Sequence, residues 1–491
     1  MSAPAPPAAH PHDASSHPRT YERRRPETTL LYEVVQEHLQ TFLAQARDRT
    51  AHGFGLPRFV QNEFHHYLDC GQLARGFLRV RCDDCRHERL LAFSCKGRVC
   101  PSCATRRMND VAEHLGDRVL PAVSYRQWTL SLPRPLRFRL AQKPALVSVV
   151  LGAFLQVVFA WQRRRARGQG VARGRTGAVT FVQNFSSALQ LNIHFHALLP
   201  DGVFAPDEDD ALAFHELDPP SDAEVGELCD KIVRRVHKHL SRADPGGADW
   251  EPDADDALAA AQAESVQAKL PHLADDDFAG ARPVRRCALR QGFSLHANVF
   301  VHARDRDGLL RLCRYGARPP LALERLTRTD DGVLLYRLKR PARSGARTLS
   351  FTPLGLLARL APLVPRPFAR TTRYHGLFSS HAKHRAQVVP SATPPQAPAS
   401  DPPPPSAAAL ARAGADRLPW SELLHRVFRI DILRCQPCGG RVRVLACITE
   451  PAVVRHILDH LGLPSEPVRA APARASPPPP QTAWGDGHFV D

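Results

Sequence analysis

Residues 191–204 read LNIHFHALLPDGVF, an apolar run in which His194 and His196 alternate with hydrophobic residues. Side chains two positions apart in a β-strand point to the same side, so the run predicts a strand over 191–199 with both imidazoles on one face. The side chains expected to enter the core are Ile193, Phe195 and Ala197. Two neutral imidazoles that leave coordination positions open suit a divalent cation that polarises a phosphate. The alternative is a pair of surface histidines on a half-exposed strand.

A third ligand would complete such a metal site, and two residues are candidates. Gln183 lies eleven residues before His194, on the predicted strand at 178–185. A hairpin between the two strands would bring Gln183 beside the histidine pair. His296, on a later predicted strand at 293–301, is the competing candidate.

Strand-like and helical stretches are mixed irregularly along the middle of the chain. The strands are expected at 125–132, 178–185, 191–199 and 293–301. An acidic insertion separates the last two strands, where Ser221 is placed to cap a helix that runs through His239, followed by a second helix at 253–270. This mixture predicts an α+β fold rather than a regular βαβ repeat.

The charge of the chain indicates a polyanionic partner. Its 491 residues include 66 Lys and Arg against 49 Asp and Glu, for a net charge of +17. That balance favours nucleic acid or an anionic membrane surface. Residues 1–26 lack the apolar stretch of a secretory signal. Residues 145–161 are apolar but near the short limit for a membrane span, and we predict a buried core helix there.

A chain of this length can form two or more hydrophobic cores. Composition shifts, Pro-rich stretches and apolar periodicity divide it into six segments. These are a disordered basic tail at 1–28, a helical and zinc-binding domain at 29–120, an α+β domain at 121–390, a Pro- and Ala-rich linker at 391–417, a small CxxC module at 418–463 and a second disordered tail at 464–491.

Six of the twelve cysteines fall within a stretch of 34 residues, from Cys70 to Cys103. Two CxxC pairs in this stretch favour a tetrahedral structural zinc site, because each pair supplies two thiolates from one tight turn. The predicted ligands are Cys82, Cys85, Cys100 and Cys103, with Cys70 and Cys95 as alternates. The alternative is a set of reduced cysteines without metal.

A further CxxC pair, Cys435 and Cys438, precedes two glycines and resembles half of a zinc ribbon. Only Cys447 lies nearby as a further thiol. A turn stabilised by the glycines and a metal site completed elsewhere in the chain are both open interpretations.

Tyr315 stands in an amphipathic helical pattern, RDGLLRLCRYGARPP. A phenolate that attacks a phosphodiester leaves a covalent phosphotyrosine, which keeps the bond energy for rejoining. Neighbouring cations would bind the strand that is attacked. The candidate DNA contacts are Arg311, Arg314 and Arg318. The alternative is that Tyr315 is a packing residue.

Taken together, these segments resemble the HUH-type rolling-circle transposases of the insertion sequence ninety-one family. The resemblance runs from about residue 29 to about residue 390 and extends to the RCQPCGGRVRVLACI stretch near the end of the chain. It is carried by EFHHYLDCGQLARGFLRVRC, SCKGRVCPSCATRRM, RQWTLSLP, LNIHFHALLPDGVF, RLCRYGARPPLALERL and RYHGLF. The order of these pieces makes the resemblance specific: a zinc module, a strand, the histidine pair and then a helix with tyrosine.

The resemblance implies that 121–390 is an HUH endonuclease domain with an antiparallel sheet and helices. It implies that His194 and His196 hold Mg²⁺ or Mn²⁺, and that Tyr315 is the nucleophile. Some relatives carry a second tyrosine four residues before the first. Here that position is Arg311, which is typical of a single-tyrosine branch.

The expected partner is single-stranded DNA at the ends of the element and at its target, with a structural zinc and a catalytic Mg²⁺ or Mn²⁺ as cofactors. The expected location is the cytoplasm, beside the nucleoid and away from membranes. A replication initiator or relaxase would use the same chemistry. A non-enzymatic zinc protein that binds DNA would explain the charge and the cysteines alone.

Overall fold

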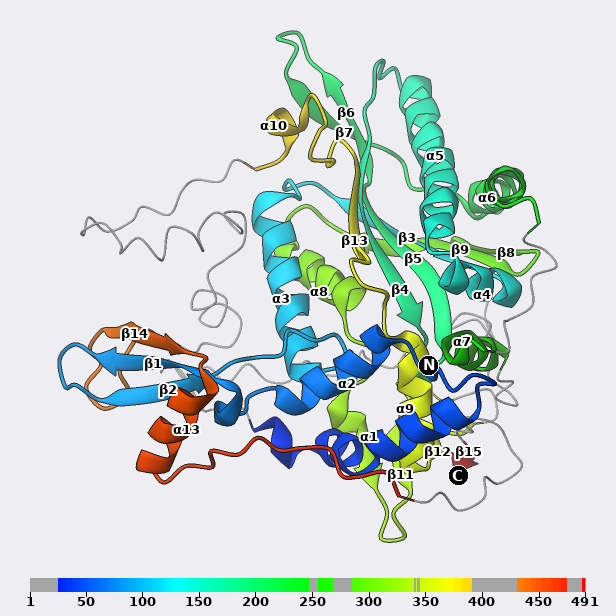
Figure 1. Cartoon of the computed structure of the whole chain (residues 1–491). Coiled ribbons are helices and arrows are strands. Elements are labelled where there is room, and N and C mark those ends of the chain that lie inside the picture. Colours follow the sequence, from blue (N-terminus) through cyan, green and yellow to red (C-terminus); the bar gives the residue numbers. More distant parts are fainter. Residues whose placement is uncertain are drawn as a thin grey trace. The chain divides into compact units, whose positions relative to one another are not determined.

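A six-stranded sheet forms the centre of the larger of two units in this chain (Figure 1). Its strands, in spatial order, are β13 Thr372–Gly376, β4 Gly177–Phe185, β5 Leu191–Pro200, β3 Tyr125–Ser131, β9 Phe293–Val301 and β8 Cys287–Arg290. Every neighbouring pair runs antiparallel. The predicted α+β class is confirmed, and the four predicted strands are β3, β4, β5 and β9 to within one residue at each end.

The computed structural model describes residues 25–246, 255–267, 285–339, 341, 345–390, 431–474 and 488–490. The smaller unit comprises Leu73–Phe93 and the described part of Asp416–Glu466, and the larger unit comprises the other described residues. The predicted linker at 391–417 lies outside the described residues, as do residues 1–24 of the predicted N-terminal tail.

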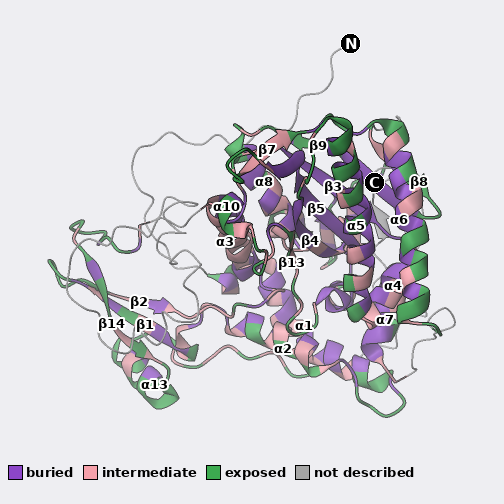
Figure 2. Cartoon of the chain, turned by 90° about the horizontal axis from the view of Figure 1, so that it is seen from above, coloured by how far each residue is buried: buried purple, intermediate pink, exposed green. Residues whose placement is uncertain are grey.

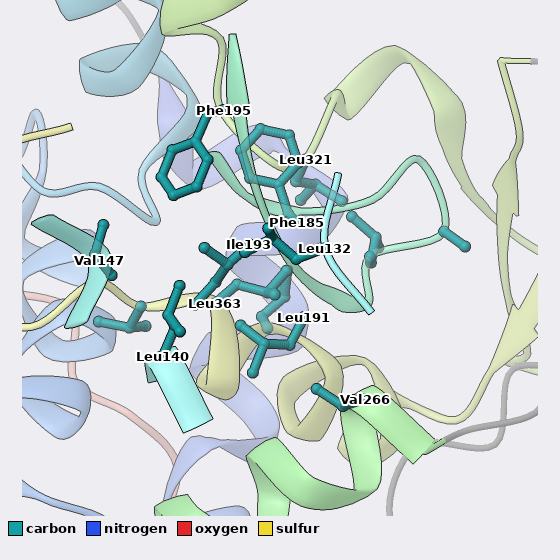
Figure 3. Packing of buried hydrophobic residues seen from close by; sticks show 14 of the residues in the cluster. Leu132, Leu140, Val147, Phe185, Leu191, Ile193, Phe195, Val266, Leu321 and Leu363 are labelled. Carbon is teal, nitrogen blue, oxygen red and sulfur yellow. The ribbon is translucent and has the colours of Figure 1, made fainter. Parts of the chain in front are cut away.

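Helices pack on both faces of the large sheet. One face carries α4 Arg134–Gln142, α5 Ala145–Gly168, α6 Asp222–Ala243 and α7 Ala257–Gln267, which share a buried cluster with Phe195 of β5. The other face carries α3 Pro101–Arg118 and α8 Arg306–Ala317, which share a second cluster with Phe181 and Leu198. Figure 2 shows the buried strands between these layers, and Figure 3 shows Ile193 and Phe195 in the core on the first face.

Helix α5 is, among the described helices, the one that is long and apolar enough to cross a membrane by length and composition alone. In this structure it is a core helix, as predicted, because 61% of its most apolar window is buried. Val150, Phe154 and Val158 are fully buried on its packed side. At its basic end Arg165 pairs with Glu224 of α6 at 2.6 Å.

The helices of the acidic insertion begin as their sequences indicate. Ser221 caps α6, where its hydroxyl accepts from the Glu224 N–H and the Glu224 carboxylate accepts from the Ser221 N–H. The helix continues four residues beyond the predicted end, to Ala243. Within the predicted helix at 253–270, α7 covers Ala257–Gln267.

The N-terminal residues of the larger unit form two helices, α1 Leu30–Asp48 and α2 Arg58–Asp69. Helix α1 packs against α9 Pro353–Leu360, which follows a small antiparallel sheet. The strands of that sheet, in spatial order, are β10 Leu326–Arg328, β11 Leu334–Arg337, β12 Thr348–Phe351 and β15 His488–Val490.

The predicted disordered tail at 464–491 needs correction at its described residues, 464–474 and 488–490. Its residues 467–474 lie along α1, where the Ala471 N–H donates to the Gln36 carbonyl at 2.7 Å and the Arg474 N–H donates to the Thr41 hydroxyl at 3.0 Å. Strand β15 then pairs with β12. Backbone hydrogen bonds to the helix and the sheet order these residues, although their Pro- and Ala-rich composition resembles a linker.

The smaller unit is a three-stranded antiparallel sheet with one helix. Its order is β14 Val442–Ile448, β1 Phe77–Cys82 and β2 Glu88–Ala92, and α13 Pro451–His460 packs on Phe77 through Val454 and Leu458. The segments predicted as separate modules at 29–120 and 418–463 therefore share this sheet, because β1 pairs with β14.

The remaining elements are short. Strands β6 Gly202–Pro206 and β7 Leu212–Glu216 form a hairpin, and α10 Arg385–Val388 is a single turn. The 3₁₀ turns are Pro26–Thr28, Leu73–Arg75, Leu323–Arg325 and Ala361–Leu363.

Candidate functional site

The two histidines of β5 lie together on the sheet face that α8 covers. Their ring centroids are 4.9 Å apart, and both side chains are buried. The alternate residues of β5 enter the core on the opposite face. The side chains that do so are Ile193, Phe195 and Ala197.

Each imidazole is oriented by hydrogen bonds at its Nδ1 atom. His194 Nδ1 lies 2.8 Å from the Asn192 carbonyl oxygen, which can only accept, so this nitrogen carries the proton and Nε2 keeps its lone pair. His196 Nδ1 lies 3.2 Å from the Thr129 hydroxyl and 3.1 Å from the Gln127 amide. His196 Nε2 is buried and has no hydrogen-bond partner among the described residues. His194 can thus present Nε2 to a metal ion, and His196 can do so in the tautomer whose Nδ1–H donates to the Thr129 hydroxyl.

The environment keeps His196 neutral. Burial lowers the pKa of His196 well below its usual value, and the charges of His194, Arg318 and His296 act in the same direction. A neutral imidazole at physiological pH is the form that binds a metal ion.

Gln183 joins β4, the strand next to the histidine strand, to the helix that carries Tyr315. It stands opposite His194 in the β4–β5 register, and its amide N–H groups donate to the carbonyls of Tyr315 at 2.9 Å and Gly316 at 2.8 Å. Its Oε1 atom is buried and has no hydrogen-bond partner in the described part of the chain. The β4–β5 hairpin therefore places the Gln183 side chain, whose Oε1 atom accepts no hydrogen bond from the described residues, on the strand next to the two imidazoles.

The competing candidate, His296, stands one strand further away. It faces Thr129 on β3, which in turn faces His196 on β5. Adjacent strands lie about 4.8 Å apart, so His296 is roughly 9.6 Å from β5, whereas Gln183 is one strand spacing away. The sheet register favours Gln183 as the third ligand.

Tyr315 lies in the last turn of α8, close to the imidazoles. Its ring centroid is 5.4 Å from that of His196. Two cations flank the ring: the Arg318 guanidinium lies 4.5 Å from its centroid and the Lys339 ammonium 5.2 Å. Neighbouring Gly316 lets α8 approach β4 this closely, because a Cβ atom there would overlap the Phe181 ring.

The three arginines proposed from the sequence occupy different surroundings. Arg318 stacks on Tyr315 and also lies 5.3 Å from the Phe185 ring. Arg314 pairs with Glu113 of α3 at 2.8 Å. Arg311 has 68% of its side chain exposed and lies 3.8 Å from Asp305. Of the three, Arg318 is the one that contacts the tyrosine ring.

A small cavity of about 90 Å³ adjoins the residues of this site. Its wall is mainly apolar, with a few polar and basic groups. The lining includes Gln183, Phe185, Gly316, Arg318, Arg98 and Arg107.

Four cysteines of the larger unit form a first cluster. Cys103 Sγ lies 3.7 Å from Cys70 Sγ and 3.5 Å from Cys95 Sγ, and Cys100 Sγ lies 3.6 Å from Cys70 Sγ. All four sulfur atoms lie within 4.8 Å of one another. Four thiolates at about 2.3 Å from a central zinc would be roughly 3.8 Å apart, so this first cluster fits a tetrahedral zinc.

Four cysteines of the smaller unit form a second cluster, Cys82 and Cys85 with Cys435 and Cys438. This corrects the predicted ligand set, which combined the pair at 82 and 85 with the pair at 100 and 103. Cys70 and Cys95, which the sequence suggested only as alternates, belong to the first cluster. The spacing of the cysteines in the sequence could not show which four share a site, because the partners of Cys82 and Cys85 lie some 350 residues away.

Sequence reasoning also missed three residues of the site. Gln127 and Thr129 orient His196, and Lys339 lies over the Tyr315 ring. Gln127 and Thr129 stand two positions apart on β3, as His194 and His196 do on β5. This spacing, which puts both side chains on one face, is the sequence signal that could have indicated Gln127 and Thr129.

Two family models match the chain. Residues 177–386 match the model described as "Putative transposase", and residues 34–132 match the "Transposase zinc-binding domain". The first match contains the histidine pair and Tyr315, and the second contains all four cysteines of the first cluster. No curated protein and no solved structure matches the chain.

Proposed function

The chain belongs to the transposases of the insertion sequence ninety-one family, and from this premise we propose that it cuts and rejoins single-stranded DNA through a covalent phosphotyrosine. The observation that carries the proposal is the position of Tyr315, which lies against His196 on one side and under Arg318 on the other. The residues proposed as nucleophile, metal ligands and phosphate-binding cation are neighbours, and this supports the proposal.

The residues on the sheet fit a divalent cation. His194, His196 and Gln183 would hold Mg²⁺ or Mn²⁺, since two imidazoles and a carboxamide oxygen meet at neighbouring positions of β5 and β4. His196 Nε2 and Gln183 Oε1 are buried there without a hydrogen-bond partner among the described residues. Such a cation, when bound, polarises a non-bridging oxygen of the scissile phosphate. Imidazole nitrogens and a carboxamide oxygen suit Mn²⁺ well and are compatible with Mg²⁺ when water completes the coordination.

In the proposed reaction the Tyr315 oxygen attacks the phosphorus atom. The Tyr315 hydroxyl gives up its proton as the new bond joins its oxygen to phosphorus, the bond from phosphorus to O3′ breaks, and the departing 3′ oxygen takes up a proton, so one proton is released and one is taken up. The 5′ phosphate stays on the tyrosine. Attack of a 3′-hydroxyl on the phosphotyrosine reverses these steps and rejoins a strand without an external energy source.

Zinc has a structural role in this proposal. The match to the zinc-binding domain and the four thiolates of the first cluster support a structural Zn²⁺ in the larger unit. Cys100 caps α3 and Cys103 lies in its first turn, so zinc there would fix the start of α3. Helix α3 packs along α8, which carries Tyr315.

The proposal is tested by a search for the covalent intermediate. The full chain is incubated with Mn²⁺ and labelled single strands from the ends of the mobile element, and the products are separated under denaturing conditions. We expect a labelled band at the mass of protein plus DNA, sensitive to protease. Absence of the band with either end would contradict the proposal and would favour a zinc protein that binds DNA without cutting it.

Arg318→Ala is expected to lower the rate of strand cleavage about ten- to a hundredfold, which corresponds to the loss of roughly 1.4–2.8 kcal/mol of transition-state stabilisation. Arg318→Lys should retain most of the activity, because it keeps a positive charge beside Tyr315. The matched control is Arg173→Ala, which removes an exposed arginine elsewhere in the larger unit. Equal rates for Arg318→Ala and the control would show that Arg318 serves only in packing.

A further inference from the structure

We propose that Cys82, Cys85, Cys435 and Cys438 bind a second zinc ion, in a ribbon built from two distant parts of the sequence. Cys82 Sγ lies 3.5 Å from Cys438 Sγ, and Cys85 Sγ lies 3.4 Å from Cys435 Sγ. These distances are far longer than the ~2.05 Å of a disulfide and near the roughly 3.8 Å expected between thiolates around zinc. Neither family model covers Cys435 or Cys438, so the matched zinc-binding domain does not account for this site.

The backbone around both cysteine pairs has the form of a metal-binding knuckle. Each pair is followed by a residue with positive φ: Arg86 at 61° and Gly439 at 73°. This turn brings backbone N–H groups to the sulfur atoms, and the Gly440 N–H donates to Cys438 Sγ at 3.4 Å. A Cβ atom on Gly440 would lie 3.0 Å from Cys82 Sγ. The two knuckles therefore face each other closely and leave no room for a side chain at Gly440.

The hydrophobic core of the smaller unit is divided into two small clusters, one beside the knuckles and one of Phe77, Val454 and Leu458 under α13. Beside the knuckles the described buried core consists of five residues, two of which are cysteines of the site. Its members are Val80, Cys82, Leu91, Cys435 and Val442. Small units with so little apolar burial commonly depend on a metal for stability, because metal binding then supplies free energy of folding. A zinc at this position would hold β14 to β1 independently of the chemistry at Tyr315.

Native mass spectrometry of the full chain, purified without chelator, tests this second site by counting bound zinc ions. We expect two zinc ions per chain in the wild type and one in Cys435→Ser/Cys438→Ser. The matched control, Cys447→Ser, removes an exposed cysteine of β14 that belongs to neither cluster, and it should keep two. A single zinc ion in the wild type that Cys435→Ser/Cys438→Ser retains would overturn the proposal, and so would a wild type without zinc. So would two zinc ions in a folded double variant.

A different observation carries a second inference, which rests on the proposed function. A groove of about 510 Å³ between α5 and α6 is lined by cations. They are Arg164, Lys231, Arg234, Arg235, Lys238 and Arg242. Lys231 pairs with Glu227 at 3.1 Å, whereas the other five have no acidic partner among the described residues. So much uncompensated charge in one groove favours a polyanion.

Five of these cations form one stripe on α6. Positions 231, 234, 235, 238 and 242 follow the three- and four-residue spacing of a single helix face, and the stripe is about 16 Å long at 1.5 Å per residue. Duplex DNA carries one negative charge per roughly 1.7 Å of axis, so a stripe of this length can contact several phosphates.

The groove offers charge without a surface for base stacking. Two aromatic rings line it: Trp161, which is 4% exposed and donates its indole N–H to Glu224, and the half-buried imidazole of His239. Proteins that bind single strands stack bases on exposed aromatic rings, which this groove lacks. The groove also lies on the sheet face opposite Tyr315. The geometry points to duplex DNA that flanks the cleaved strand as its occupant, held through the phosphate backbone.

The test replaces four exposed cations of α6 with glutamine: Arg234, Arg235, Lys238 and Arg242. We expect duplex affinity to fall at least tenfold, and the slope of log K against log salt to decrease in magnitude by about 3.6, since each of the four lost phosphate contacts contributes ~0.9. The matched variant, with the three arginines changed to lysine, should bind like the wild type. Adduct formation with a short single strand should be unchanged, which separates this inference from the proposed function.

Unchanged duplex affinity in the glutamine variant would overturn the inference. An equal loss of affinity for single strands would also overturn it, because the groove would not then select duplex DNA. The same holds if the variant lost binding to vesicles of anionic lipid while keeping its affinity for duplex DNA.

Discussion

Tyr315→Phe is expected to abolish both strand cleavage and the covalent adduct, with loss of activity beyond the detection limit of the assay. The substitution removes only the hydroxyl oxygen that would form the bond to phosphorus. The ring remains, so its contacts with His196 and Arg318 and the packing of α8 should persist. DNA affinity should therefore stay close to that of the wild type. The measurement is the yield of labelled adduct beside a binding titration with the same strand.

The matched control is Tyr374→Phe, on β13 of the same sheet. Tyr374 is a more exposed tyrosine, at 36%, and the removal of its hydroxyl should leave the adduct yield unchanged. A covalent complex formed by Tyr315→Phe would show that another residue is the nucleophile. Loss of the adduct in Tyr374→Phe but not in Tyr315→Phe would assign that role to β13.

The second large effect is expected when both histidines of β5 are replaced. His194→Ala/His196→Ala should lower the cleavage rate by about a thousandfold or more, since a metal ion that polarises phosphate contributes several kcal/mol to the transition state. Chelation of the wild type should have the same effect, and excess Mn²⁺ should restore activity to the wild type but not to the double variant. The measurement is single-turnover cleavage of a labelled strand by the double variant and by the chelated wild type, each before and after addition of excess Mn²⁺.

His381→Ala is the matched control for the histidine pair, because His381 is an exposed histidine of the same unit. It should cleave at the wild-type rate. Zinc content is measured in parallel, so that loss of structural zinc during chelation is not mistaken for loss of the catalytic ion. Cleavage that persists in excess chelator, with zinc content unchanged, would contradict a metal-dependent mechanism.

Much of the sheet was predictable because its central strands carry strong local patterns. Strands β3, β4, β5 and β9 are long and rich in aromatic and β-branched residues, so alternation alone located them. Strands β8 and β13 are four and five residues long, and each depends on a neighbour for its hydrogen bonds. Such short strands have no periodicity of their own to detect.

The candidate site was predictable where chemistry and local pattern coincide. His194 and His196 share a face because of the strand period, and Gln183 lies opposite them because a short hairpin sets the register. The proximity of Tyr315 to His196 is a tertiary contact, and only the order of the motifs indicated it. Residues 467–474 dock on α1 through backbone hydrogen bonds, which composition does not encode.

The pairing of β1 with β14 has a consequence for the order in which the chain is made. Cys85 and its partner Cys435 are separated by 350 positions, and a ribosome adds about 5–20 residues per second. The first knuckle therefore leaves the ribosome roughly 20–70 seconds before the second one exists. During that interval Cys82 and Cys85 are half of the proposed metal site, and a chain that ends prematurely never completes it. The ribbon thus forms only in a chain whose synthesis has passed the catalytic domain.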